Sequence, residues 1–556
     1  MKKILALLLC AAMLAGCTAA PDQTTSPTEI QPPATEAEQP VYQGDVVDIL
    51  LEGQNVTIGG AAAADEGDVY ISRDIVYYEQ KTQYDSGNPY GEGSEADMHA
   101  AQEAADHLVV NITEPGNYRL SGRLDLGQIR IDLGEDARED PNAVVVLILD
   151  GVEITCTVAP AILFQNVYEC DGNWSVETAT PDVDTTAAGA NLILAENSEN
   201  VVNGSYVAKI YKDKEGEKKL VKQDGAIYSY MSMNVFGPGS LDLNAENEGL
   251  DTELHLTIHG GNLNIRSGND GINTNEDGVS VTTIRGGNVR IVAGLGEEGD
   301  GIDSNGYLVI RGGTVISSAN PAADAGLDSD LGSYIHGGTV VALGAAMDWA
   351  ESDSGQVTMN LQFSEAQRGD IQILREDGTP VFTFAPAVDP VLGEDFRNYR
   401  GAILSCADFQ VGDTYVVFVD GIQMAYTGTD VMSRPGGFRP GEGGQRPEMG
   451  VTPPDEMPEP PEADFTIPPD PGVDIPMMPQ GEQQPPAGTG QRPEDWTGPE
   501  GDWTGPEGDW TGPEGDWTMP EGQRPPEGHG SWQGEKSTLF YMQDMVNFFS
   551  GLTAAE

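Results

Sequence analysis

The chain has 556 residues and carries 90 acidic against 28 basic side chains, which gives a formal net charge of −62. This length exceeds what one compact core usually holds, and such a charge repels phosphate backbones, which excludes nucleic acid as an expected partner. The 70 glycines and 37 prolines indicate that part of the chain is rich in turns or unfolded.

The N-terminus reads as a secretory signal peptide. Residues 1–17 hold two lysines, an apolar run from Ile4 to Leu14, and Leu-Ala-Gly before Cys17. The apolar run is too short to span a membrane. The ending resembles the bacterial lipobox, which implies a lipidated Cys17 and a lipid anchor on the extracellular face of the bacterial cell membrane. An ordinary signal peptide with an incidental cysteine is the alternative. Residues 18–44 predict a flexible tether.

Short strands dominate the sequence from residue 45 onward. Alternating apolar and polar residues between turn signals predict strands at 56–58, 108–112, 118–121, 128–131, 144–149, 191–194 and 240–243. Residues 96–106 are the one helix-like stretch in this part of the sequence. Residues 206–222, which contain six lysines, predict a protruding loop or hairpin.

The cysteines beyond the leader are Cys156, Cys170 and Cys406. Three widely spaced thiols do not form a disulfide framework, and no Cys-x-x-Cys or Cys/His metal motif is present. A bridge between Cys156 and Cys170 and a pair of free thiols are both compatible with the sequence.

The middle of the chain repeats itself with a period of about 25 residues. Glycine pairs begin at Gly260, Gly286, Gly312 and Gly337, and each pair precedes a short alternating strand. Glycine pairs allow sharp turns where a Cβ atom would clash. The repeat therefore predicts an all-β fold in which residues 45–350 form a right-handed parallel β-helix, a solenoid of stacked coils. The leucine-rich framework of the rival solenoid class is absent.

Stacking of the coils aligns acidic and amide side chains in columns. The first predicted column holds Glu248, Asp270, Asp300 and Asp324, the last of these with a one-residue shift. The second holds Asp251, Asn273, Asp303 and Asp328, and the third holds Glu253, Asn275, Asn305 and Asp330.

These columns predict calcium sites. Neighbouring strands of a parallel sheet lie ~4.8 Å apart, and carboxylates at that separation repel one another unless a cation lies between them. Ca²⁺ accepts six to eight oxygen ligands, including amide and backbone oxygens, and suits such columns better than Mg²⁺ does. The alternative is that Asp and Asn only serve as solvated turn residues. The last coil, Gly344-Ala-Ala-Met-Asp-Trp, lacks the full acidic turn, so no calcium site is expected there.

The repeat ends near residue 350. Residues 351–432 contain strand patterns joined by Asp-Gly turns and predict a small β domain. Residues 433–535 are rich in Pro, Gly and Glu and repeat Asp-Trp-Thr-Gly-Pro-Glu-Gly, which predicts a disordered segment. The apolar residues at 536–556 predict a return to the small β domain, with a membrane-surface helix as the alternative.

The chain resembles the carbohydrate-binding-domain lipoproteins of clostridial cell surfaces, which are polysaccharide-lyase-like β-helices. The resemblance rests on Glu114-Pro-Gly-Asn-Tyr-Arg-Leu-Ser-Gly, Leu149-Asp-Gly-Val-Glu-Ile, and the Gly-Gly and Asp-Gly-Ile coils. It implies Ca²⁺ on the helix and binding of plant cell-wall polymers, namely cellulose and polygalacturonate. The lysine-rich insertion, the residue shift at Ala325 and the incomplete last coil depart from the pattern.

Three functions follow as hypotheses. The leading one is a non-catalytic, lipid-anchored, monomeric surface protein that binds polysaccharide in a calcium-dependent way, with Tyr307, Tyr334 and Trp349 as candidate sugar-stacking or core residues. The second is a calcium-dependent polysaccharide lyase, which requires a base near the metal; the candidate bases are Arg266, Arg285, Arg290 and Arg311. The third is a structural adhesin whose coils Ca²⁺ only rigidifies.

Overall fold

The computed structural model describes residues 44–79, 93–172, 175–211, 219–345, 348–386, 389, 392–393, 396–429 and 536–555. The predicted signal peptide, Cys17, the tether before residue 44 and the tryptophan repeats lie outside the described residues. Among the described residues, no helix has the length and apolar character needed to cross a membrane.

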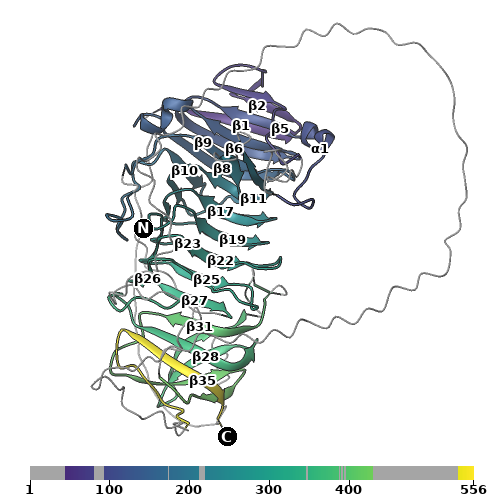
Figure 1. Cartoon of the computed structure of the whole chain (residues 1–556). Helices are drawn as coiled ribbons and strands as arrows, with labels where there is room; N and C mark the ends of the chain where they lie inside the picture. The colour runs from purple at the N-terminus through teal and green to yellow at the C-terminus, as the bar shows by residue number, and fades with distance from the viewer. Residues whose placement is uncertain are drawn as a thin grey trace, which may run out of the picture. The chain divides into compact units, whose positions relative to one another are not determined.

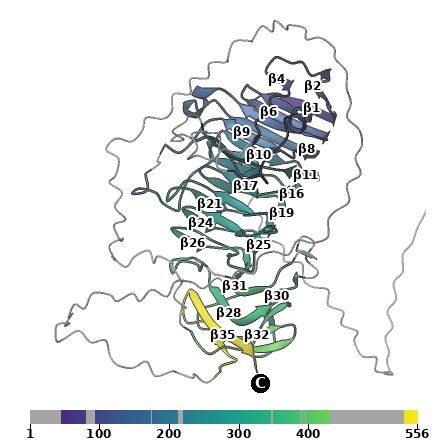
Figure 2. The same ribbon diagram turned by 45° about the vertical axis from the view of Figure 1, so that its right-hand side comes forward.

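The described chain winds through a parallel β-helix whose coils contribute strands to three faces. Face one contains β10 (Ala190–Leu194), β15 (Met233–Phe236), β18 (Leu256–Ile258), β21 (Val281–Ile284), β24 (Tyr307–Ile310) and β26 (Gly332–Ile335). Face two contains β11 (Glu199–Gly204), β16 (Ser240–Ala245), β19 (Asn262–Ser267), β22 (Asn288–Val292), β25 (Thr314–Ser318) and β27 (Thr339–Gly344). β11, β19, β22, β25 and β27 of face two follow one another in Figure 1, and β21, β24 and β26 of face one do so in Figure 2. The predicted solenoid architecture is confirmed.

Face three is a separate sheet. Its strands are β4 (Val69–Ser72), β5 (Leu108–Ile112), β7 (Gly127–Asp132), β9 (Ile162–Asn166), β14 (Gly225–Ser229), β17 (Glu248–Thr252), β20 (Ile272–Thr274) and β23 (Ile302–Ser304). All of its pairings are parallel except that of β4 with β5.

The first coils use longer strands. β1 (Val46–Gly53), β6 (Gly116–Leu124) and β8 (Val145–Thr155) pair in parallel, and β8 then pairs with both β10 and β11. β2 (Asn55–Ile58) and β3 (Ala61–Ala62) add an antiparallel edge. The predicted helix is only α1 (Ala101–Asp106), and a 3₁₀ helix spans Glu135–Glu139.

The coil interior is a continuous apolar core. Leu263, Ile265, Val289, Ile291 and Val315 are fully buried, as their alternating positions predict. Each such side chain contributes roughly 1.5–3 kcal/mol on burial.

The glycine pairs lie at the turn between face one and face two. The second glycine of each pair has a positive φ, which is 82° at Gly287 and 82° at Gly313. A Cβ atom at Gly287 would lie 2.5 Å from the carbonyl oxygen of Gly261 one coil away. Backbone conformation and close stacking therefore both require glycine at this turn.

The lysine-rich segment contains a hairpin. β12 (Val207–Tyr211) and β13 (Lys219–Gln223) pair antiparallel, and residues 212–218 lie outside the described residues.

The C-terminal strands continue the sheet of the solenoid. β31 (Tyr399–Ser405) pairs with β27 and with β28 (Thr358–Gln367), and β35 (Val546–Ala554) pairs with β28. Figure 1 shows β27, β31, β28 and β35 in this succession. The remaining strands are β29 (Ile371–Arg375), β30 (Pro380–Phe384), β32 (Thr414–Val419), β33 (Ile422–Ala425) and β34 (Phe540–Tyr541). The core of the C-terminal strands includes Ile316 and Val341 from the outer side of face two. The C-terminal strands therefore pack directly against the solenoid, with no layer of solvent between them.

Candidate functional site

The second predicted column lies on face three in the expected order. Asp251 pairs with Asn273, and Asn273 pairs with Asp303, on the successive strands β17, β20 and β23. Asp328 directly follows Leu327, which forms a bridge to Ile302 on β23. Four successive coils therefore present an oxygen-bearing side chain at this position.

The third column lies two residues farther along each coil. Asn275 Nδ2 donates to Asp251 Oδ1 (2.6 Å), and Asn305 Nδ2 donates to the carbonyl oxygen of Asn275 (2.8 Å). The hydroxyl of Tyr228 donates to Glu253 Oε1 (2.5 Å). Asp330 belongs to the same column, since its backbone N–H donates to Ser304 one coil away. Amide donors thus hold part of the acidic surface in place.

The first column is interrupted at its lower end. Gly271 N donates to the carbonyl oxygen of Asp300, whereas Gly301 N donates to that of Ala325. Asp324 therefore lies one residue out of the register of Asp270 and Asp300. This is the one-residue shift that the first predicted column contains. Its Oδ2 atom accepts a hydrogen bond from Gly299 N (2.8 Å) instead.

Backbone donors occupy one oxygen of each aspartate in this first column. Asp270 Oδ1 accepts from Asp300 N (2.6 Å), and Asp300 Oδ1 accepts from Ala325 N (2.5 Å). These carboxylates therefore brace adjacent coils and retain their second oxygen for another partner.

The tightest acidic cluster lies beside β14 and β17 of face three, at the upper end of the acidic columns. One carboxylate oxygen from each of Asp224, Glu248 and Asp251 lies within 4.8 Å of the other two. Asp224 is absent from the predicted columns. The sequence does contain a signal for Asp224, because the Asp-Gly pair at 224–225 matches the Asp-Gly pairs at 270–271 and 300–301. However, the pair at 224–225 lies outside the regular period.

Two buried oxygens beside this cluster have no hydrogen-bond donor. Asp251 Oδ2 and Asn273 Oδ1 have no partner among the described residues, and Asp251 is 0% exposed. Asn273 Nδ2 donates to Glu248 Oε2 (3.2 Å). An unsatisfied buried oxygen costs roughly 1–3 kcal/mol. Carboxylate and amide oxygens around one point are the donor set that Ca²⁺ prefers, so the residues present fit this metal.

One cationic side chain reaches the cluster. Lys222 on β13 forms an ion pair with Asp224. Glu248 and Asp251 also contribute to the raised pKa of Lys222, although burial opposes them. One ammonium group cannot neutralise three carboxylates, so the cluster keeps an excess of negative charge when all three are ionised.

Burial raises the pKa of five acidic groups along face three. The pKa of Glu248 rises to about 7, chiefly through burial and then through Asp224. The pKa of Asp251 lies well above its usual value, chiefly because of burial and then because of the neighbouring charge on Glu248. The pKa values of Asp270, Asp300 and Asp303 each rise to about 8, again through burial first and neighbouring carboxylates second. A cation bound beside these groups would favour their ionised forms.

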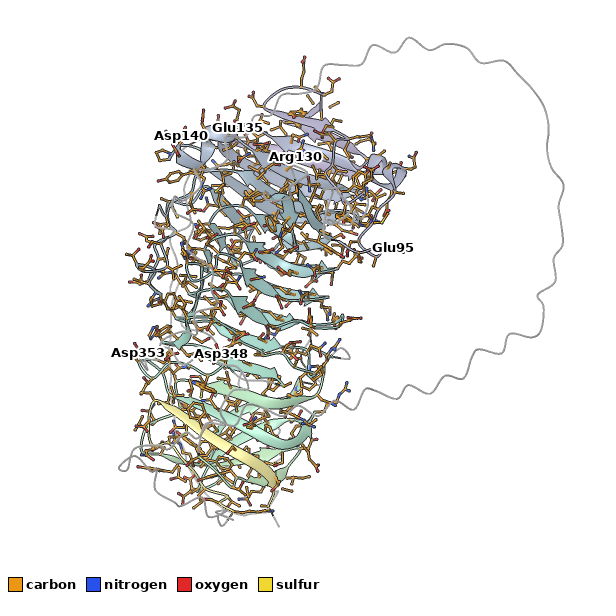
Figure 3. All side chains as sticks on the ribbon, in the orientation of Figure 1. Glu95, Arg130, Glu135, Asp140, Asp348 and Asp353 are labelled. Carbon is orange, nitrogen blue, oxygen red and sulfur yellow. The ribbon has the colours of Figure 1, made fainter. Side chains whose placement is uncertain are left out.

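The last coil uses its acidic residue differently. Asp348 Oδ2 accepts hydrogen bonds from the backbone N–H of Ser329 (3.1 Å) and from its hydroxyl (3.0 Å). Figure 3 labels Asp348 and Asp353 near each other on the side where Figure 1 labels β26. Asp348 thus ends the solenoid with a structural contact.

The candidate bases for a lyase lie on the other two faces. Arg290 on face two forms an ion pair with the buried Asp389 (Nε to Oδ2, 3.1 Å), and Arg311 on face one forms one with Asp182 (Nη2 to Oδ1, 3.0 Å). Arg290 pairs with Asn264, so Arg266 lies two residues out of its register. Ion pairs favour the protonated form of arginine, which is opposite to what a base requires.

The three cysteines in the described residues are free thiols. Burial raises the pKa values of Cys156 and Cys170 to about 12. Both thiols are therefore protonated at neutral pH and are poor nucleophiles.

Part of the chain is similar to known proteins. Residues 106–360 match a family model described as "Carbohydrate-binding domain-containing protein". A protein of that description from Acetivibrio thermocellus is 31% identical over 159 residues, which cover 28% of this chain and 45% of the relative. The matching part thus spans less than half of the relative's length. The predicted family resemblance is confirmed.

A solved structure also matches. It is described as a polysaccharide lyase-like protein from C. thermocellum, in a gadolinium derivative. It is 21% identical, with a TM-score of 0.29, and the match covers 53% of this chain and 93% of that chain.

Proposed function

Residues 106–360 match the model of a carbohydrate-binding domain family, and from that premise we propose that this protein binds polysaccharide in a calcium-dependent way without cleaving it. The ligands proposed are plant cell-wall polymers, cellulose or polygalacturonate, on the basis of the family resemblance. The proposal includes a monomer that Cys17 anchors through lipid to the extracellular face of the bacterial cell membrane.

The observation that supports calcium most directly is the pair of orphaned oxygens on Asp251 and Asn273 beside Asp224 and Glu248. These four residues are the first proposed calcium ligands. Asp270, Asp300, Asp303, Asn305, Asp324, Asp328 and Asp330 are proposed to hold further Ca²⁺ along face three. Hard cations there would offset the mutual repulsion of the columns and the cost of burying charge.

Calcium also offers a route to an acidic polymer. The chain carries a net charge of −62 and repels polyuronates over long distances. A cation held by the columns attracts ligand carboxylates as well, because Ca²⁺ accepts more oxygens than one coil supplies. Binding of polygalacturonate through face three is therefore proposed to depend on the metal.

A lyase is the second candidate function, and the ion pairs of Arg290 and Arg311 argue against it. A base must release its proton before it can remove one from the sugar ring. The third candidate, a structural adhesin, shares the calcium sites but has no glycan ligand.

Affinity electrophoresis of the full chain tests these three candidates together. Gels are cast with polygalacturonate or a soluble cellulose derivative and run in Ca²⁺ or in EDTA. We expect retardation in Ca²⁺, weaker retardation by polygalacturonate in EDTA, and no clearing of the polymer. Clearing supports the lyase, and absence of retardation in every gel supports the adhesin.

Two variants connect the result to the site. Asp251→Asn is expected to weaken the calcium-dependent retardation, whereas Asp65→Asn makes the same chemical change at an exposed turn and should leave it intact. Equal behaviour of the two variants would contradict the assignment of Asp251 as a metal ligand.

A further inference from the structure

Face one carries a column of basic side chains that the metal-based proposal does not use. His259, Arg285, Arg311 and His336 follow directly after Ile258, Ile284, Ile310 and Ile335, which are aligned on β18, β21, β24 and β26. Backbone N–H groups of Arg285, Arg311 and His336 donate to the preceding coil at 2.7–2.8 Å. The four residues, called here the basic column, therefore stack with one member per coil.

The backbone fixes the position of this column. The four isoleucines before it are 0–1% exposed, so period-two alternation turns the basic residues outward. The glycine pair follows immediately on every coil, and its close packing leaves no room for a Cβ atom. Neighbouring members are thus separated by ~4.8 Å on a rigid support.

The column retains unused hydrogen-bond donors. Arg285 is exposed, and its guanidinium makes no hydrogen bond with the part of the chain that the structure describes. Arg311 Nε has no partner among the described residues either. His336 is exposed and its Nδ1 accepts from Gly355 N (3.0 Å), so Nε2 carries the proton of the neutral ring. Guanidinium groups bind carboxylates and sulfates well because they present several donors in one plane.

Aromatic rings line the lower end of the column. The ring of Tyr334 lies 6.2 Å from that of Tyr307 and 6.1 Å from that of His336, with 25° between the planes of the latter pair. Both tyrosines are half-buried. Aromatic rings beside cationic donors offer a surface for the apolar faces of sugar rings. Trp349 instead packs edge-on against Phe548.

Acidic side chains from an irregular segment lie against the column. Asp182, with a side chain 82% exposed, pairs with Arg311, and Asp184 lies near Arg285 and His259. These two aspartates also line a cavity of about 310 Å³ together with Asp171, Thr180 and His255. An exposed ion pair contributes little to stability, so an incoming anion can replace Asp182 on Arg311.

From this arrangement, we propose that the basic column binds the acidic groups of an anionic polysaccharide directly and without metal, with Tyr334 under a sugar ring. The proposal rests on the proposed carbohydrate-binding function and adds a second contact surface to it. The ligand chemistry is a linear sugar polymer with a carboxylate or sulfate on its residues. In a chain of net charge −62, Arg285 and Arg311 stack on neighbouring coils. Burial and the adjacent arginines lower the pKa values of His259 and His336, so the histidines act as neutral hydrogen-bonding groups.

The test measures binding of the full chain in EDTA, which removes any contribution of calcium. Polygalacturonate, dextran sulfate and a neutral cellulose derivative serve as ligands in a titration. We expect the double variant Arg285→Ala/Arg311→Ala to lose at least about tenfold in affinity for the acidic polymers. Arg368→Ala/Arg400→Ala removes two exposed arginines elsewhere and should change little. Preference between the first two polymers distinguishes carboxylate from sulfate recognition.

A second variant is expected to bind acidic polymers more tightly, which misfolding cannot explain. Asp182→Asn removes the competing carboxylate and should strengthen binding of acidic polymers, with Asp65→Asn as the matched control. The proposal is overturned if wild type binds no acidic polymer in EDTA or if the two double variants behave alike. Retained calcium-dependent binding in those cases leaves the proposed function intact, whereas absence of binding to every glycan in both buffers removes both.

Discussion

Asp251 and Asn273 are register partners on β17 and β20, and each retains one buried side-chain oxygen without a hydrogen-bond donor. Most buried polar atoms in proteins are hydrogen-bonded. Two orphaned oxygens on adjacent coils, next to Glu248 and Asp224, therefore mark the place where a bound cation would relieve the most electrostatic strain.

Removal of the carboxylate of Asp251 should separate two effects on stability: the binding of calcium, and the repulsion between the carboxylates of Asp251 and Glu248. Asp251→Asn is expected to leave the metal-free protein equally stable or more stable, because a buried carboxylate beside Glu248 disappears. The same change should abolish most of the increase in melting temperature that Ca²⁺ produces. Thermal unfolding in Ca²⁺ and in EDTA, with Asp65→Asn as the control, checks both parts. An unchanged calcium response would argue against Asp251 as a ligand.

Lys222 is expected to compete with calcium for the upper cluster. Lys222→Met removes the cation paired with Asp224 and should destabilise the metal-free protein by roughly 1–3 kcal/mol. It should also raise calcium affinity, by roughly tenfold, because a positive charge near the site disappears. Calorimetric titration with Ca²⁺ measures the affinity. Weaker calcium binding in this variant would show that Lys222 orders the site instead.

The stability of the metal-free protein should fall as the pH rises from about 4 to 8. The folded-state pKa values of Asp270, Asp300 and Asp303 are about 8, above the ordinary value of 3.8. Across that window the folded state binds more protons than the unfolded state, so each pH unit lowers the free energy of unfolding. Above pH 8 the slope from these groups vanishes. Melting curves in EDTA at several pH values check the sign.

Calcium should change this pH profile. Because Ca²⁺ binds the ionised carboxylates, its stabilising effect should be small near pH 5 and larger near pH 8. A calcium-induced shift in melting temperature that is equal at both pH values would contradict the assignment of these aspartates to metal sites.

The turn between face one and face two should tolerate no side chain. Gly287→Ala places a Cβ atom 2.5 Å from the carbonyl oxygen of Gly261 at a φ of 82°. Gly378→Ala makes the same change at a φ of 84° with no atom within 4 Å. We expect a loss of about 1–2 kcal/mol at Gly378 from conformation alone and a larger loss at Gly287. Chemical denaturation measures the free energy of unfolding of both variants. Equal losses would show that the close approach of Gly261 adds no destabilisation at position 287.

The sequence by itself determined the solenoid and the order of its columns. A constant period sets the register of parallel coils, because each coil pairs only with its neighbours. The alignment of Asp251, Asn273 and Asp303 follows from the matching triplets Gly-Leu-Asp, Gly-Ile-Asn and Gly-Ile-Asp that end at these residues. The one-residue offset of Asp324 follows from Ala325, which separates it from Gly326. Inward alternation at Leu263 and Ile265 follows from strand periodicity.

Only the tertiary structure decided which acidic residues meet in the tightest cluster and which arginines are engaged. Lys222 approaches Asp224 and Glu248 from the hairpin that interrupts the coils, and Asp182 reaches Arg311 across 129 positions of sequence. Irregular segments obey no period, so their contacts depend on how the chain folds back over the coils. The raised pKa values of Asp270, Asp300 and Asp303 depend on burial, which the period of the sequence does not set. The periodic sequence determines which acidic residues align in the columns. The groups that pack around the columns determine how readily those residues ionise.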